Sequence, residues 1–402
     1  MLYSPRLKDG SLVRLPWPVT LYKYFNHICW PLEDNVSNFY IYLDRCAIYI
    51  GFLIFCLHNE VDFHYVIHHR HDLDKMLEGM PTYLILVEIQ IRGFQLAFTK
   101  QQFKRLLQQF YAQIYVTAQS EPTLYKLIQK QMLAMRLNSI NYLLALLNYF
   151  MVPVWNIIYH RRDMLYKQVY LFDNTVLYFY IPLLICNYWV GFIIDSMLFG
   201  ELNVIGELMM HLNARYVLLS RDLQQLAQRC LAKQRHSVNL AVDLQLQLRQ
   251  LLRRHIALNA FAARMEREFS LRIFFSFSFS TGLLCVLGFK AYTNPFANLV
   301  YLVWFAGKFF ELLAFGMLGS TLHKTTDDLS TMYYSCGWEQ IVYHSPNAQE
   351  NIKLMKLISR VIQIYSVPVS LTGFKYFRVT LEAVVKIIQG AFSYFAFLKS
   401  MR

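Results

Sequence analysis

The sequence predicts an all-α, polytopic membrane protein with seven transmembrane helices, and two observations carry this prediction. Hydrophobic residues make up 56% of the 402 positions, and the mean hydropathy of +0.28 is positive, as is typical of chains that enter a bilayer. Stretches long enough to cross a hydrocarbon core of about 30 Å also recur along the chain. The seven predicted spans are 38–57, 80–98, 137–158, 176–199, 273–289, 296–318 and 376–398.

These spans divide the chain into six parts. In order, we expect a cytoplasmic N-terminus (1–37), transmembrane helices one to four (38–199), a cytoplasmic helical extension (200–272), transmembrane helices five and six (273–318), a cytoplasmic linker with an amphipathic helix (319–375), and a seventh transmembrane helix with a short extracellular tail (376–402).

The orientation follows from the first segment and from the positive charges. Residues 1–37 contain four prolines and no apolar core ahead of a small-residue cleavage site, so we expect no signal peptide. The predicted inner segments hold 26 Lys and Arg residues and the outer segments 8, although the long segment 200–272 supplies 11 of the 26. This bias favours a cytoplasmic N-terminus and an extracellular C-terminus. The sequon Asn35-Val36-Ser37 would then be cytoplasmic and unmodified.

The net charge and the chemical motifs exclude several classes. The net charge is +13, but a positive excess on cytoplasmic segments is expected of a membrane protein, so we predict no nucleic-acid partner. The seven cysteines form no CxxC pair and no evident disulfide framework. Because no nucleotide-binding loop, HExxH or GxSxG motif is present either, we predict neither a cofactor nor an enzyme.

The segments between the spans have helical periodicity. In 200–272, leucines and other apolar residues recur on one face, which indicates helices that continue beyond the membrane and pack together. A second apolar face runs through 351–369, with Lys353, Lys356 and Arg360 between its apolar positions and Pro368 near its end. We interpret this run as a separate amphipathic helix in the same cytoplasmic bundle.

Charged residues within the predicted spans require an explanation, because each costs about 2.5 to 3.5 kcal/mol at a helix centre. Three pairs have helical spacing and opposite charge: Glu88 and Arg92, Lys308 and Glu311, and Glu382 and Lys386. Each pair can be partly neutralised within its own helix. A structural ion pair is the simpler interpretation, and a water-filled path or a cavity wall is the alternative. Asp195 has no such partner in sequence.

Aromatic residues gather in the predicted outer halves of helices two, three, four and six. An interfacial aromatic belt explains many of them. Together they could also enclose an apolar cavity with a few hydroxyl and indole donors, as suits a small volatile hydrophobic ligand. The candidate ligand-binding residues are Tyr83, Tyr149, Phe150, Trp155, Tyr188, Trp189, Trp304 and Phe305.

The predicted first outer loop contains five histidines, among them His58, His64 and His68. If this loop were helical, the spacing of His64 and His68 could present a metal-binding face. Solvated loop histidines are the simpler interpretation, because no cysteine lies near them in the loop. We predict no metal site.

The last seventy residues carry an ordered set of motifs. These are Tyr334-Ser335-Cys336-Gly337-Trp338, Gln363, Pro368, Leu371-Thr372-Gly373, Leu381-Glu382, Lys386, and Ser393-Tyr394-Phe395 followed by Leu398-Lys399. In this order they resemble the C-terminal signature of the insect odorant receptors. Two departures exist: Val384 replaces a frequent phenylalanine, and Ser400-Met401 stands where gustatory receptors have Gln-Phe.

The resemblance implies a ligand-specific subunit of a heterotetrameric, odour-gated, non-selective cation channel. Its partners would be an odorant co-receptor, a small volatile ligand and membrane lipid. Helix seven would line the pore, with Phe397 and Met401 at the hydrophobic gate and with Glu382 and Lys386 along it. The expected location is the plasma membrane of olfactory neuron dendrites. The alternatives are a gustatory-type chemoreceptor, a metabotropic seven-helix receptor of inverted topology and a transporter.

Overall fold

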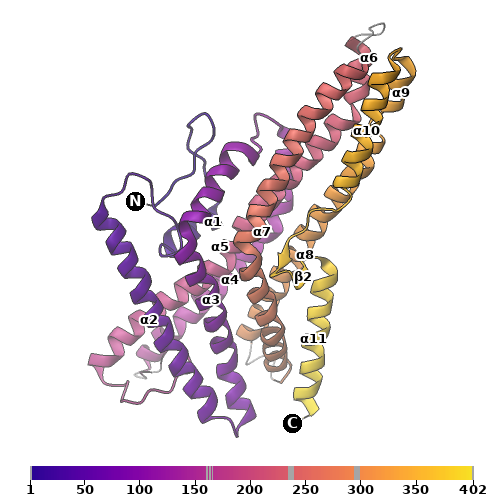
Figure 1. The fold of residues 1–402 in the computed structure, drawn as a ribbon. Helices are drawn as coiled ribbons and strands as arrows, with labels where there is room; N and C mark the ends of the chain where they lie inside the picture. The colour runs from indigo at the N-terminus through magenta and orange to yellow at the C-terminus, as the bar shows by residue number, and fades with distance from the viewer. Residues whose placement is uncertain are drawn as a thin grey trace.

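The computed structural model describes residues 2–159, 162, 164, 166–233, 240–293 and 299–400. Helices dominate this part of the chain (Figure 1). In order, the elements are α1 (Trp17–Phe25), α2 (Asn38–His68), α3 (Leu73–Gln109), the π-helical turn η1 (Phe110–Ile114), α4 (Pro122–Ile158), α5 (Leu177–Gln224), α6 (Leu226–Lys233), α7 (Leu240–Thr293), α8 (Leu299–Tyr334), α9 (Trp338–His344), α10 (Ala348–Ile364), β1 (Thr372–Gly373), β2 (Phe377–Arg378) and α11 (Leu381–Ser400).

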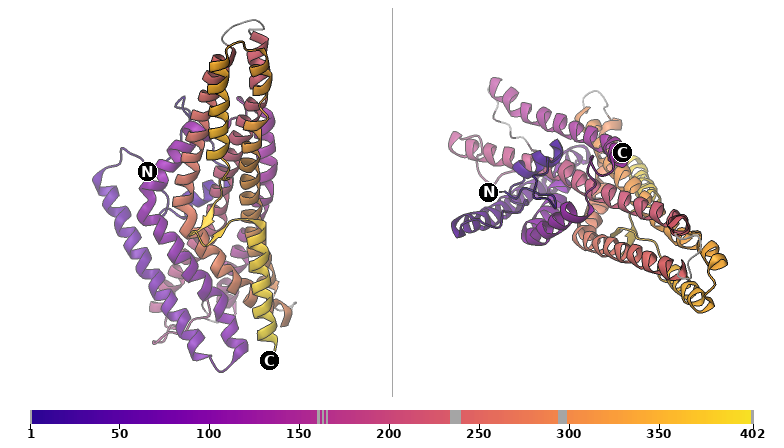
Figure 2. Two further views of the ribbon diagram at one scale, coloured as in Figure 1. Left: turned by 45° about the vertical axis from the view of Figure 1, so that its right-hand side comes forward. Right: turned by 90° about the horizontal axis from the view of Figure 1, so that it is seen from above.

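Helices α5 and α7 are much longer than a membrane span, with 48 and 54 residues. At 1.5 Å per residue α7 extends for about 80 Å, whereas a hydrocarbon core is only about 30 Å thick. The upper parts of α5, α7 and α8 run together with α6, α9 and α10 as an arm that leads away from α2, α4 and α11 (Figures 1 and 2). This arm corresponds to the helical bundle that the sequence predicts.

The core of the arm is built from the apolar stripes of its helices. Leu219 and Leu223 of α5 are buried, as are Leu244 and Leu248 of α7. Helix α10 buries one face and exposes its lysines, and the Asn347 side chain caps it by accepting a hydrogen bond from the Glu350 backbone N–H at 3.3 Å. The predicted amphipathic helix is therefore present, although it ends at Ile364 instead of Val369.

The Tyr-x-Cys-Gly-Trp motif forms the turn between α8 and α9. Gly337 has φ +81°, a left-handed conformation in which a side chain is strained. A Cβ atom there would also lie 2.9 Å from Ala227 Cβ of α6. The Trp338 indole N–H donates to the Tyr334 carbonyl at 2.9 Å. Cys336 is buried, and this burial raises the pKa of its thiol to about 11.

A buried histidine packs among tyrosines inside the arm. The His255 ring of α7 stacks on Tyr365 with ring centroids 4.1 Å apart, and its Nδ1 lies 2.9 Å from the Tyr333 hydroxyl. Tyr216 of α5 contacts the ring edge-on. Burial lowers the pKa of His255 to about 4, because the charged form loses its solvation. His255 is therefore neutral at physiological pH.

Six of the described helices, α2, α4, α5, α7, α8 and α11, are long and apolar enough to cross a membrane. The predicted second span, 80–98, lies entirely within α3, which does not meet this criterion. The reason is its composition, since Glu88, Gln90, Arg92 and Gln95 fall inside that segment. Helix α3 nevertheless packs beside α2 and α7.

Besides the end of α10, two further boundaries, the end of α2 and the start of α11, differ from the prediction. Helix α2 continues to His68, so His58, His64 and His68 are helical residues instead of loop residues. His58 is buried and its Nε2 hydrogen-bonds to Asn187 Oδ1. Among the described residues, no group of three His, Cys, Asp or Glu side chains has a geometry that could hold a metal ion.

The second boundary is the start of the last helix. We expected it at residue 376, but α11 begins at Leu381. Residues 372–378 form a small antiparallel hairpin instead, with Gly373 opposite Phe377 and with positive φ at Phe374 and Lys375. Among the described residues, the fold is therefore all-α apart from this hairpin and two isolated β-bridges near the N-terminus. The Phe377 ring of the hairpin stacks on Phe277 of α7, with ring centroids 5.1 Å apart.

Gly319 of α8 allows the chain after this hairpin to cross close by. A Cβ atom at Gly319 would lie 1.9 Å from the Val379 carbonyl oxygen, which is far inside the contact distance. The missing side chain thus lets the entry to α11 pack directly on the α8 backbone. Val384 and Ala391 then bury one side of α11, which packs against α7 and α8.

Candidate functional site

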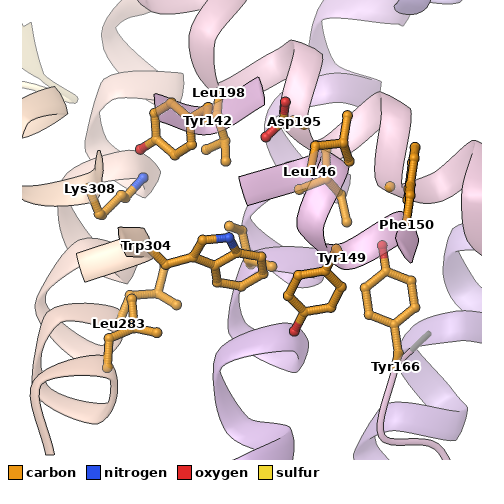
Figure 3. Close-up of a pocket in the computed structure, with 14 residues that line it drawn as sticks. Tyr142, Leu146, Tyr149, Phe150, Tyr166, Asp195, Leu198, Leu283, Trp304 and Lys308 are labelled. Carbon is orange, nitrogen blue, oxygen red and sulfur yellow. The ribbon is translucent and has the colours of Figure 1, made fainter. Parts of the chain in front are cut away.

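A cavity lies between α4, α5, α7 and α8 (Figure 3). Ile85 of α3 and Tyr166, from the segment between α4 and α5, complete its wall. The lining residues are Ile85, Tyr142, Leu146, Tyr149, Phe150, Tyr166, Gly191, Ile194, Asp195, Leu198, Leu283, Leu287, Trp304 and Lys308. Most of them are aliphatic or aromatic, so the cavity suits a small, largely apolar molecule.

The cavity is small. Its volume is about 40 Å³, and a cavity must offer at least about 10 to 15 Å³ to hold one water. A ligand larger than a few heavy atoms therefore requires the side chains to move apart. Tyr149 and Trp304 are the largest facing pair; their rings stack with centroids 5.1 Å apart and an angle of 13°. Both lie at the centre of Figure 3.

Three of the eight predicted ligand-binding residues line this cavity, namely Tyr149, Phe150 and Trp304. Tyr188 lies behind Phe150: its hydroxyl donates to the Phe150 carbonyl at 3.0 Å, and the two rings meet edge-on at 4.7 Å. Tyr188 therefore supports Phe150 from behind and does not itself line the cavity.

The other four predicted residues lie elsewhere. Trp189 packs edge-on against Phe55 of α2, and Tyr83 packs against Phe63 of the same helix. Trp155 is more than half exposed, as an interfacial side chain would be. Phe305 faces a second cavity, described below.

Polar groups line one side of the cavity, where Tyr142, Asp195 and Lys308 lie above Trp304 in Figure 3. The Tyr142 hydroxyl donates to Glu311 Oε2 at 2.9 Å. Lys308 Nζ donates to Glu88 Oε1 at 3.0 Å and to Glu311 at 3.3 Å. The aromatic pattern of the sequence did not identify Tyr142 and Tyr166 as cavity residues. Asp195 and Lys308 were identified as charges within predicted spans, but the sequence did not show that they line the cavity.

Lys308 also belongs to a buried ion network behind the cavity. We define this network as Glu88 and Arg92 of α3, Glu201 of α5, Glu268 and Arg272 of α7, and Lys308 and Glu311 of α8. Arg92 pairs with Glu88 and with Glu201, and Arg272 pairs with Glu201 at 3.2 Å and with Glu268 at 3.1 Å.

Two of the predicted intrahelical pairs thus merge into one network. All seven side chains are buried, and charges removed from water are stable only when they are paired and hydrogen-bonded. The third predicted pair behaves differently. Lys386 Nζ lies 2.7 Å from Glu382 Oε1, but these side chains are 71% and 76% exposed.

Asp195 differs from the four carboxylates of the ion network, each of which lies in an ion pair. Only 6% of the residue is exposed, and its Oδ2 has no hydrogen-bond partner among the described residues. Lys308, the cation of the same wall, is held by Glu88 and Glu311. Burying such a group without a partner is unfavourable, so the cavity contents are the remaining source of a hydrogen bond.

A second, more apolar cavity lies between α7, α8 and α11 and includes Phe305, Phe392 and Phe395 in its wall. Its volume is about 270 Å³ on the same measure. Phe397 lies on the opposite side of α11 and is 60% exposed, so that it faces away from this chain. Met401, the other predicted gate residue, lies outside the described residues.

Comparison with known proteins assigns the family. A family model described as 7tm Odorant receptor matches residues 72–392, which is more than half of the chain. The chain is 62% identical to Odorant receptor 74a of Drosophila melanogaster over 400 residues, covering 100% of this chain and 99% of that protein. It is 43% identical to Odorant receptor 35a of the same species, covering 100% of this chain and 98% of that protein.

The fold agrees with this assignment. The structure of the insect olfactory receptor OR5 from Machilis hrabei in complex with eugenol superposes with a TM-score of 0.74 at 10% identity, covering 96% of this chain and 98% of that one. A second structure of the same receptor gives a TM-score of 0.73. This chain therefore belongs to the insect odorant receptor family, and it is a multi-pass membrane receptor.

Proposed function

We propose that this chain is the ligand-specific subunit of an odour-gated, non-selective cation channel in the plasma membrane of olfactory neuron dendrites. In this proposal the chain assembles with an odorant co-receptor as a heterotetramer surrounded by membrane lipid. A small volatile ligand binds in the cavity between α4, α5, α7 and α8, and α11 of each subunit lines a shared pore.

The observation that carries the channel proposal is the uncovered face of α11. One side of this helix packs through Val384 and Ala391 on its own chain, whereas Tyr394 and Phe397 on the other side are exposed. An apolar, exposed stripe on a helix that can span a membrane requires lipid or further subunits beside it. Neighbouring copies of α11 would cover this stripe, and Phe397 would then narrow the pore and close it by dewetting.

Gating also requires an energetic link to the ligand. A ligand opens the channel only if it binds the open arrangement more tightly than the closed one. Helices α7 and α8 supply such a link, because Leu283 and Trp304 line the ligand cavity while Leu284 and Phe305 line the cavity beside α11. Widening of the first cavity would therefore alter the surface on which α11 rests.

Whole-cell recording tests this proposal. Cells expressing the chain with and without an odorant co-receptor would be exposed to a panel of volatiles under G-protein blockade. We expect an odour-evoked cation current that requires both subunits and survives the blockade. A current abolished by the blockade would support a metabotropic receptor instead, and silence of complexes that reach the surface would contradict the channel proposal.

A further inference from the structure

Asp195 is a buried carboxyl group in the wall of the ligand cavity, and no protein partner is found for it among the described residues. Asp195 is only 6% exposed, and its side chain forms part of the cavity wall (Figure 3). The enclosed Oδ2 has no hydrogen-bond partner among the described residues. The Tyr142 hydroxyl and the Lys308 ammonium group of the same wall are already engaged, since Tyr142 donates to Glu311 and Lys308 to Glu88.

We propose that Asp195 accepts a hydrogen bond from a hydroxyl group of the ligand, so that this cavity selects small alcohols over ligands of the same shape without a donor. This inference rests on the proposed function and adds the chemical class of the ligand. The remaining wall supplies mainly aliphatic and aromatic contacts, for example from Leu146, Leu198 and Trp304, which suit the hydrocarbon part of such a molecule.

The selectivity follows from what each ligand displaces when it enters the cavity. The cavity has room for water, and a water beside Asp195 would satisfy the carboxylate in the absence of ligand. A ligand hydroxyl that replaces this water restores its hydrogen bond, whereas an ether displaces the water and leaves the oxygen unsatisfied. Sites built around a substrate hydroxyl reject analogues that lack it.

A neutral hydroxyl fits the site better than an ammonium group. Desolvating a cation costs far more than desolvating a hydroxyl, and the wall around Asp195 is otherwise mainly apolar. We therefore expect 1-pentanol to be preferred to pentylamine as well as to the isomeric ether.

The experiment compares isomeric pairs on the complete receptor with its co-receptor. The pairs are 1-pentanol with methyl butyl ether, and 2-phenylethanol with benzyl methyl ether, each of identical formula. For the wild-type chain we expect the half-maximal concentration of at least one alcohol to be about tenfold below that of its ether, the ratio that corresponds to about 1.4 kcal/mol. Equal potency within both pairs, or a preference for pentylamine, would overturn the inference while leaving the proposed function intact.

Two substitutions assign the preference to Asp195. Asp195→Leu removes the acceptor and should abolish the difference within each pair. Asp195→Asn keeps the size of the side chain but adds a donor that an ether can use, so it should reduce the difference. Leu198→Met is the matched control, because it changes an apolar part of the same wall and should affect both isomers alike. Retention of the full alcohol preference in an Asp195→Leu receptor at the surface would contradict the inference. Silence of wild-type complexes to every probe would overturn the proposed function itself.

Discussion

Lys308 Nζ of α8 lies 3.0 Å from Glu88 Oε1 of α3, although the two residues are 220 positions apart in sequence. This contact joins the Glu88–Arg92 pair of α3 to the Lys308–Glu311 pair of α8. It also connects the cavity wall with the buried ion network. Glu311, which also binds Lys308, accepts hydrogen bonds from Tyr142 of α4 and Ser276 of α7. The polar side of the cavity is thus held from four helices.

Removing Lys308 should be strongly destabilising. Lys308→Met leaves the four carboxylates of the ion network with only two guanidinium groups, and breaking a buried ion pair costs about 3 to 5 kcal/mol. We expect a large fall in the thermal stability and surface expression of the receptor. In a double-mutant cycle with Glu88→Gln, the combined loss should be smaller than the sum of the single losses.

The matched control is Lys353→Met in α10. Lys353 pairs with Glu350 at 2.6 Å, but its side chain is largely exposed, and surface pairs contribute only about 0 to 1 kcal/mol. Equal effects of the two lysine substitutions would show that the buried network has no special importance for stability.

Gly319→Ala should displace α11. The new methyl group would occupy the space of the Val379 carbonyl oxygen, 1.9 Å from the ideal Cβ position, and backbone cannot yield as a flexible side chain does. Overpacking of this kind costs about 1 to 3 kcal/mol or more. We expect lower thermal stability together with reduced current at equal surface expression.

Gly282→Ala provides the comparison for this substitution. Gly282 lies within α7, where a Cβ atom would meet the nearest side chain, Leu84, at an ordinary 3.5 Å. Alanine is also the better helix former, so stability should be unchanged or slightly higher. If both alanine variants behaved alike, close packing at Gly319 would not be the cause.

Phe397→Ala should alter the closed state of the channel. If Phe397 forms the hydrophobic constriction, the smaller side chain should allow water and ions to pass at rest and raise the leak current. Phe395→Ala is the control on the inner side of α11, where the ring packs against Tyr292 of α7 with centroids 5.6 Å apart. It should weaken packing without creating a leak. Unchanged conductance in assembled Phe397→Ala complexes would remove that residue from the gate.

The buried His255 should make the arm sensitive to acid. Its pKa is about 4 in the folded chain, below the value of about 6.5 expected when the chain is unfolded. Between these values the unfolded state binds more protons, so the free energy of unfolding decreases as the pH falls from about 6.5 to 4. Thermal unfolding of the purified receptor at a series of pH values measures this slope.

His255→Gln should flatten the slope, because glutamine does not titrate in this range. His64→Gln serves as its control, since His64 lies on the exposed surface of α2. A wild-type pH dependence that survived His255→Gln would assign the acid sensitivity to other groups.

Glycosylation mapping tests the orientation. Asp173→Asn creates an Asn-x-Thr sequon with Thr175 in the exposed segment between α4 and α5. With an extracellular loop at this point, the variant should gain one glycan that a glycosidase removes. Asn35, in the natural sequon, should remain unmodified. Modification of Asn35 in the wild-type chain would reverse the predicted orientation.

Much of the architecture could be predicted because it depends on local properties. Hydropathy and helical spacing identify the long helices, and the apolar stripe of 351–369 anticipates α10. The C-terminal motifs point to the family because they are residues in a fixed order, whatever their contacts. The start of α11 could not be predicted in this way. The segment before it is apolar and aromatic and resembles a membrane span, but positive φ values at Phe374 and Lys375 allow it to turn as a hairpin.

The sequence by itself therefore determined the helices, the family and which residues are unusual within a span, such as Asp195 and the charged pairs. Only the tertiary structure decided how they combine: that Tyr149 and Trp304 share a cavity while Phe305 faces another, and that Lys308 joins Glu88. The physical reason is that the period of a helix identifies an apolar face without identifying its neighbour. Contacts between residues that are far apart in sequence arise only when the helices pack.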